Sequence, residues 1–143
     1  MSMTDEREIR EVFERWAAAS AAKDLDASME PIASCIVSYE HSSPLQFTDI
    51  DLIREECRVG FERQASDFEW TVPDLEVVVR GDIAVTWGLN KMTDGNSDGS
   101  SSTGWSRGTR VFQKTDGRWQ MIHQHVSFPT DPVTGMAATE LQP

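Results

Sequence analysis

The sequence predicts an α+β fold in which helices come first and long strands follow. Apolar residues recur at helical spacing over residues 4–23, whereas the runs 104–115 and 118–128 flank Asp116-Gly117, a dipeptide typical of a tight hairpin turn. Both runs exceed the usual strand length of about five or six residues, so we expect them at the centre of a sheet. Helices followed by strands predict helices packed on one face of a curved antiparallel sheet.

The chain has 143 residues, a length that fits one domain with a core over about 4–129 and an irregular tail over 130–143. Its net charge of −11 argues against a nucleic-acid partner and against an anionic membrane surface. The first residues lack a secretion signal, and no apolar run approaches the roughly 20 residues that span a bilayer. The two cysteines, Cys35 and Cys57, show neither disulfide-scaffold nor metal spacing, so we expect a reduced, cytoplasmic setting.

The first half of the chain predicts three helices and one strand. Thr4 can cap the helix over 4–23, on whose apolar stripe Trp16 could reach a pocket wall. A short helix follows Lys23-Asp24-Leu25-Asp26 and stops before Pro31. A strand over 33–40 and a helix over 49–63, capped by Thr48, come next. Cys57, on the apolar stripe of that helix, is expected to be buried rather than reactive.

The second half predicts strands throughout. Strands are expected over 67–72, 74–80 and 82–93, with a turn at Arg80-Gly81-Asp82. Residues 94–104 are rich in Gly, Ser, Asp and Asn and predict a mobile hairpin loop or lid.

Several short sequence motifs resemble those of a known family. They are Lys23-Asp24-Leu25-Asp26, Tyr39-Glu40-His41 at a strand end, Arg80-Gly81-Asp82-Ile83-Ala84-Val85, Arg107-x-Thr109-x-Val111-Phe112-x-Lys114-x-Asp116-Gly117-x-Trp119 and His123-x-His125-x-Ser127. Together they resemble the nuclear transport factor 2-like superfamily, especially SnoaL-like and ketosteroid-isomerase-like proteins. The C-terminal part is also similar to the association domain of calcium/calmodulin-dependent protein kinase II. The resemblance implies a cone-shaped (cystatin-like) sheet wrapped around the helices, a pocket between sheet and helices, and a homodimer formed through the outer sheet face.

Strand alternation divides the long strands into two faces. One face has small and polar side chains, which leave room for a ligand: Thr86, Gly88, Asn90, Ser106, Gly108, Arg110, Phe112, Gln120, Ile122, Gln124 and Val126. The resemblance to the association domain matches its pocket arginine to Arg110. We therefore predict that Arg110, Asn90 and Gln124 line the pocket.

The other face is bulky and aromatic, as in a dimer interface: Val85, Trp87, Leu89, Trp105, Arg107, Thr109, Val111, Trp119, Met121, His123, His125 and Ser127. A β-bulge would exchange the two faces, so Trp105, Arg107, His123 and His125 remain alternative pocket residues. The two histidines could hold a metal only with a third ligand, from His41 or a carboxylate. Hydrogen bonding at an interface is the favoured interpretation, and no metal or cofactor is predicted.

Tyr39, Glu40 and His41 end the first strand, near the position of the carboxylate base in ketosteroid isomerase. Glu40 or His41 is the candidate base, Tyr39 and Trp16 are candidate ligand contacts, and Arg110 would stabilise negative charge. Alternatively, Arg110 pairs with a structural carboxylate from a helix. The first helix has no tyrosine, and no aspartate lies opposite on the hairpin strands, so a steroid-type mechanism is not supported.

The sequence thus favours a protein that binds a small organic ligand. It would be a cofactor-independent isomerase, cyclase or dehydratase acting on an anionic or enolisable substrate. The alternative is a non-catalytic ligand-binding or dimerisation module.

Overall fold

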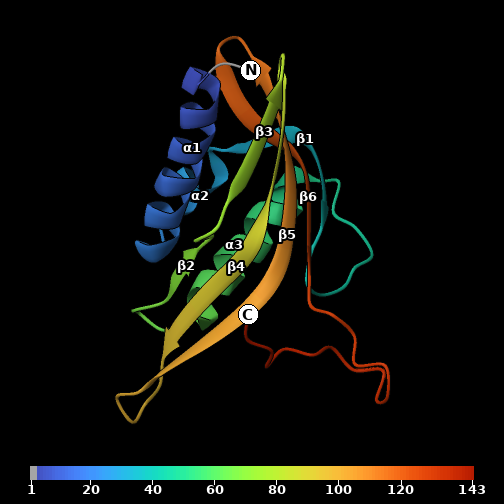
Figure 1. Ribbon diagram of the computed structural model, residues 1–143. Helices are drawn as coiled ribbons and strands as arrows, with labels where there is room; N and C mark the ends of the chain where they lie inside the picture. The colour runs from blue at the N-terminus through green and yellow to red at the C-terminus, as the bar shows by residue number, and fades with distance from the viewer. Residues whose placement is uncertain (1–2) are drawn as a thin grey trace.

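The computed structural model describes residues 3–143 and shows the predicted α+β architecture (Figure 1). The prediction that the first residues lack a secretion signal includes Met1 and Ser2, which lie outside the described residues. Within the described chain, the elements are α1 (Met3–Ala21), α2 (Leu25–Met29), β1 (Ile32–Tyr39), α3 (Ile50–Arg63), β2 (Glu69–Thr71), β3 (Glu76–Arg80), β4 (Ile83–Gly95), β5 (Ser101–Thr115) and β6 (Arg118–Ser127).

The strands form a six-stranded sheet in the order β1-β6-β5-β4-β2, and β3 also pairs with β4. β3 pairs with the first half of β4, and β2 pairs with its second half. The prediction of an antiparallel sheet is right for every pair except β1 and β6, which run parallel. A parallel pair needs a long crossover connection. Here the whole chain from α3 to β5 separates the two strands, so that requirement is met.

The helices lie on one side of the bent sheet, as Figure 1 shows, and the core fills the space between. Ile9 and Phe13 of α1 and Ile53 of α3 are buried together with Ala84 and Phe112 of the sheet. The apolar stripes predicted for the two longer helices therefore face the sheet. Burying these side chains is the main favourable term for the fold.

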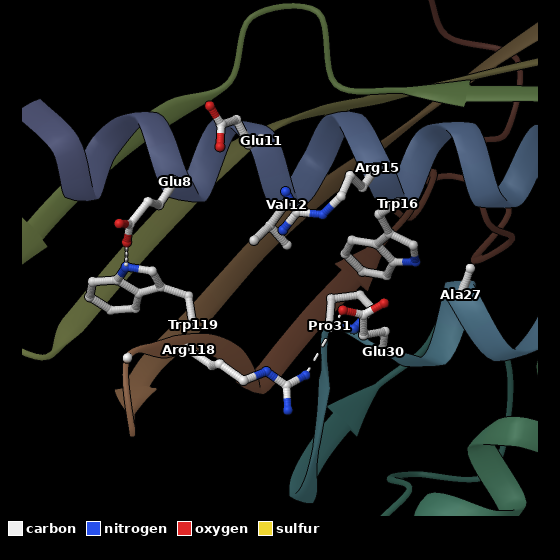
Figure 2. A pocket seen from close by; sticks show the side chains of 11 residues that line it. Glu8, Glu11, Val12, Arg15, Trp16, Ala27, Glu30, Pro31, Arg118 and Trp119 are labelled. Atoms are coloured by element: carbon white, nitrogen blue, oxygen red, sulfur yellow. Dashed lines mark hydrogen bonds and ion pairs between the residues drawn. The ribbon is translucent and has the colours of Figure 1, made fainter.

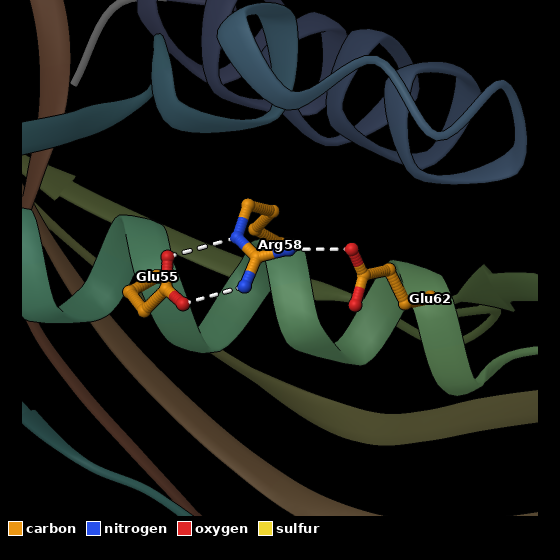
Figure 3. A network of polar contacts seen from close by, with 3 residues as sticks. All are labelled: Glu55, Arg58 and Glu62. Atoms are coloured by element: carbon orange, nitrogen blue, oxygen red, sulfur yellow. Dashed lines mark hydrogen bonds and ion pairs between the residues drawn. The ribbon is translucent and has the colours of Figure 1, made fainter.

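The opposite side of α3 faces solvent and is charged. Arg58 donates to Glu55 and to Glu62, which lie three residues before it and four residues after it (Figure 3). These spacings place the three side chains on one helix face. All three groups are exposed, so the network contributes little to stability.

Two local predictions were wrong in their details. Asp49, not Thr48, caps α3, because its carboxylate accepts a hydrogen bond of 2.8 Å from the Asp51 N–H. The predicted loop 94–104 shrinks to residues 96–100, since β4 and β5 continue pairing to Gly95 and Ser101. Small polar residues can extend a strand when a partner strand is already aligned beside them.

The β5–β6 hairpin forms as predicted, but it contains a bulge. Asp116 and Gly117 have φ values of 53° and 78°, as a tight turn of this kind requires. Val111 pairs with His123 and Phe112 pairs with Met121, so Ile122 is an extra residue in β6. The bulge turns Trp119 and Met121 toward the helices, where they are 6% and 1% exposed. Their predicted place on the outer dimer face was therefore wrong.

The tail after β6 is irregular, as predicted, apart from one bridge between Thr130 and Ala137. Its end returns to β5, where the Trp105 indole donates to Gln142 Oε1 at 3.1 Å. No helix within residues 3–143 is long and apolar enough to cross a membrane.

Candidate functional site

A cavity of about 370 Å³ lies between the helices and the sheet. Five polar residues lie on its sheet wall, among apolar residues of the strands: Glu40, His41, Asn90, Arg110 and Gln124. Its helix wall is largely apolar and includes Trp16, Met29, Ile53, Cys57 and Phe61. A largely apolar hollow with a few convergent polar groups is the usual form of a small-molecule site.

Arg110 is the centre of the sheet wall. It is 3% exposed, and its Nε donates to Gln124 Oε1 at 2.8 Å while its Nη2 donates to Asn90 Oδ1 at 2.9 Å. A guanidinium has five N–H donors, so these two bonds leave donors for a ligand. Both partners are neutral amides. They orient the cation without neutralising its charge.

Aromatic rings from α1 and β2 lie around the Arg110 guanidinium. Its central carbon lies 5.4 Å from the ring centres of Trp16 and Trp70 and 5.7 Å from that of Phe13. Ring faces attract a cation, and they do so more strongly away from water. The aromatic groups thus compensate part of the cost of burying this charge.

Gly108 makes room for the Arg110 side chain. A Cβ at position 108 would lie 2.7 Å from Arg110 Nη1 and 3.1 Å from Asn90 Nδ2. Any side chain there would displace the guanidinium or the amide. Glycine is therefore required by close approach at this position rather than by an unusual φ.

Glu40 reaches Arg110 through Gln124 rather than directly. Gln124 Nε2 donates to Glu40 Oε2 at 2.8 Å, and the Ser38 hydroxyl donates to the same oxygen at 2.5 Å. Within residues 3–143, both hydrogen bonds to this carboxylate end on Oε2, which leaves Oε1 available to a ligand in the cavity. A base that is held in orientation through one oxygen can accept a proton at the other.

His41 closes the polar network from the rim of the cavity. Its Nε2 lies 2.7 Å from Ser106 Oγ, and Ser106 Oγ accepts a hydrogen bond of 3.0 Å from Asn90 Nδ2. The Ser106 hydroxyl proton is then free to be donated to a neutral imidazole. The network thus runs from His41 through Ser106 and Asn90 to Arg110.

Burial shifts the proton affinities of the two basic groups. It lowers the pKa of Arg110 to about 10, against the opposing effect of Glu40, so Arg110 remains a cation at neutral pH. Desolvation by the surrounding protein also lowers the pKa of His41. The negative charge of Glu40 opposes this change, and the positive charge of Arg110 lowers the pKa further. His41 itself lies at the rim of the cavity and is exposed.

The sequence-predicted residues fall on both sides of the sheet. Trp16, Glu40 and His41 line the cavity with Arg110, Asn90 and Gln124. Tyr39 is outside it, so its predicted role as a ligand contact was wrong. Because alternate strand residues face opposite ways, Tyr39 points outward when Ser38 and Glu40 point inward, and its ring contacts His123 and His125.

The outer sheet face holds the remaining candidates. Arg107 and His125 are exposed, Trp105 is half-buried, and His123 Nδ1 lies 2.7 Å from the Val37 carbonyl oxygen. Within residues 3–143, no three His, Cys, Asp or Glu side chains gather in an arrangement that could hold a metal ion. None of these four residues lines the cavity around Arg110.

Sequence reasoning missed two groups that complete the site. The Trp70 indole donates to Asn90 Oδ1 at 3.2 Å, and Ser106 joins Asn90 to His41. Ser106 was already on the predicted pocket face, which was the available signal. Trp70 comes from the short strand β2, whose side-chain direction nothing in the sequence indicates.

A second hollow, of about 270 Å³, lies between α1, the end of α2 and the β5–β6 turn (Figure 2). Two of its charged groups have partners within the chain: the Trp119 indole donates to Glu8 Oε2 at 3.0 Å, and Arg118 lies 4.0 Å from Glu30. Its charged groups lie on an open surface, and none of them is buried as Arg110 is. The cavity around Arg110 is therefore the better candidate site.

The fold and the cavity define a nuclear transport factor 2-like protein. The chain belongs to the SnoaL-like domain family, whose model matches residues 9–131. The resemblance predicted from the sequence is thereby confirmed. No curated protein matches the chain.

Solved structures agree with this assignment. An NTF2-like protein of unknown function from Pseudomonas putida KT2440 is 31% identical, with 100% of this chain and 99% of that chain covered and a TM-score of 0.90. The association domain of C. elegans CaMKII is 21% identical (87% and 95% covered, TM-score 0.73). An NTF2-like superfamily protein from Salmonella enterica is 18% identical (94% and 97% covered, TM-score 0.75). The last two likenesses concern the fold alone.

Proposed function

We propose that the protein binds a small organic anion, such as a carboxylate or an enolate, in the cavity beside Arg110. One observation is the main support: within residues 3–143, the buried Arg110 forms hydrogen bonds to two neutral amides and no ion pair. A buried cation that no anion contacts directly is costly, and an anionic ligand would supply a direct partner through charge-assisted hydrogen bonds.

Proton transfer is the chemistry that this arrangement favours. Glu40 would accept a proton at Oε1 from a carbon next to a carbonyl or carboxylate group, and Arg110 would stabilise the negative charge that develops on the oxygen. His41, neutral at pH 7, would return or redirect the proton from the rim. An isomerase, cyclase or dehydratase of an enolisable substrate would fit these roles without a cofactor. Glu40→Gln should then abolish turnover while leaving anion binding in place.

A non-catalytic ligand-binding and dimerisation module is the second candidate. The outer sheet face supports dimerisation, because Trp87 is 46% exposed there and Ile83 and Tyr39 are each 37% exposed. A second copy of the chain would cover these side chains. A relative of similar fold is named an association domain. The two unpaired cysteines fit a reducing, cytoplasmic setting.

Calorimetry with arylalkanoates such as 4-phenylbutanoate tests anion binding. Arg110→Ala should weaken binding about tenfold to a hundredfold, the usual range for a charge-assisted hydrogen bond. Arg110→Lys should retain part of the affinity, because it keeps the charge and loses the planar contacts to Gln124 and Asn90. Equal affinity of the wild type and Arg110→Ala would contradict the proposal.

A further inference from the structure

The tail after β6 contains a small hairpin, residues 129–138, which we call the tail hairpin. The Ala138 N–H donates to the Pro129 carbonyl oxygen at 2.7 Å, and the Asp131 N–H donates to the Met136 carbonyl oxygen at 2.8 Å. The Asp131 carboxylate accepts two further hydrogen bonds, of 2.8 and 3.3 Å, from N–H groups of the turn. The segment therefore has a defined shape of its own, and Figure 1 shows this red part of the tail extending away from the sheet and the helices.

The tail hairpin exposes apolar side chains at its tip. Residues 132–137 are all exposed, and Val133 and Met136 are 91% and 70% exposed. A two-stranded hairpin is at best marginally stable by itself in water. Two exposed apolar side chains on such a protrusion therefore indicate that another surface covers them.

The charge of the tail indicates what kind of surface this is. Residues 128–143 include Asp131 and Glu140 and no Lys, Arg or His. Within the part of the chain that the structure describes, neither carboxylate forms an ion pair. Opposite charges across an interface favour association, and like charges oppose it. The covering surface should therefore be basic as well as partly apolar.

The outer face of β5 and β6 has both properties. Neither strand contains Asp or Glu, although the whole chain has a net charge of −11. Arg107 is exposed there and forms no ion pair within residues 3–143, and Lys91 Nζ of β4 lies 5.7 Å from the ring centre of half-buried Trp105. Half-buried Val111 adds apolar surface. The chain's own tail hairpin leaves Arg107 exposed, so a hairpin that covers this face has to come from another chain.

We propose that the tail hairpin of each chain packs against the outer face of β5 and β6 in a second copy of the chain. Val133 and Met136 contact the apolar side chains of that face, and the tail carboxylates lie near Arg107. In a two-fold pair each copy gives one hairpin and receives one, so the contact closes on a dimer. The tail already follows this side of the sheet, because the Trp105 indole donates to Gln142 Oε1 at 3.1 Å. The inference rests on the proposed sheet-face dimer and assigns the tail a part in it.

Sedimentation equilibrium of the full chain tests the proposal. Val133→Lys should raise the dissociation constant of the dimer at least about tenfold, because the lysine has to be desolvated beside the positive charge of Arg107. Leu52→Lys is the matched control, since Leu52 is 56% exposed on α3, on the other side of the sheet from this face. It should leave the dissociation constant unchanged.

A substitution on the receiving face tests where the hairpin packs. Arg107→Glu alone should weaken the dimer, because it repels the acidic tail. Added to Val133→Lys, it places a carboxylate opposite the new lysine and should improve association about threefold over Val133→Lys alone. A double variant that associates no better than Val133→Lys would overturn the inference. Unchanged association of Val133→Lys would overturn the inference and leave the sheet-face dimer intact, whereas a wild type that stays monomeric at high concentration would overturn both.

Discussion

Gln124 stands between Arg110 and Glu40 and bonds to both. Its Oε1 accepts from Arg110 Nε at 2.8 Å, and its Nε2 donates to Glu40 Oε2 at 2.8 Å. The cation and the carboxylate are thus coupled through a neutral amide and form no direct ion pair. A direct pair would neutralise both groups, whereas this arrangement keeps both charges available to a ligand.

Gln124→Glu should abolish anion binding. The substitution places a carboxylate against Arg110, which then satisfies the guanidinium internally, and a second negative charge repels the ligand. We expect the affinity for 4-phenylbutanoate to fall by at least about tenfold, measured by calorimetry. Gln124→Met is the control, because it removes the bridge without adding charge. It should lower affinity less than Gln124→Glu does, and equal losses in the two variants would contradict the charge argument.

Gly108→Ala should destabilise the protein. The added Cβ would lie 2.7 Å from Arg110 Nη1 and would displace the buried guanidinium. We expect the free energy of unfolding to fall by about 1–3 kcal/mol, the usual cost of overpacking, in chemical denaturation. Gly60→Ala is the control, since a Cβ there, in the last turn of α3, meets nothing within 4 Å. It should stabilise the helix by up to about 1 kcal/mol. A stabilising Gly108→Ala would contradict the close packing.

His41 should make stability depend on pH. Its pKa in the folded protein lies below the unfolded value of about 6.5, so the unfolded chain binds the proton more readily. The contribution of neutral His41 is therefore fully present above about pH 6.5 and is lost as the pH falls through the folded pKa. The unfolding temperature of the wild type relative to His41→Gln should be constant near pH 8 and should decline between pH 7 and pH 5. A difference that is constant or increases toward acid would contradict this assignment.

Particular residues show what the sequence could and could not predict. Strand alternation and the Asp116-Gly117 turn placed Asn90, Arg110 and Gln124 on one face, because periodicity and turn chemistry are local properties. The position of the bulge at Ile122 could not be predicted, because an extra residue in β6 depends on how β6 pairs with β5 and not on the sequence of β6 alone. The sequence also could not predict that Ser28 Oγ and Gln64 Oε1 lack a hydrogen-bond partner within the described residues, because this depends on how α2 and α3 pack together.

The outer sheet face should associate with a second copy of the chain. After the bulge removes Trp119 and Met121 from it, the face still exposes Ile83 and Trp87, with half-buried Val85 and Val111 beside them. Tyr39 is also exposed on this face, across Thr109 and His125 from Trp87. Soluble monomers rarely expose large contiguous apolar patches, and the helices cover only the other face of the sheet (Figure 1). A two-fold partner presenting the same face would bury the patch.

Trp87→Lys tests this association. A charged side chain in place of Trp87, the most exposed of these three residues, would have to be desolvated in the dimer, so the variant should sediment as a monomer at concentrations where the wild type has twice the chain mass. Leu52→Lys is the matched control, because Leu52 is 56% exposed on α3, away from the outer sheet face. It should leave association unchanged. A wild-type protein that remains monomeric at high concentration would contradict the interface and would leave Trp87 as an exposed residue without a partner.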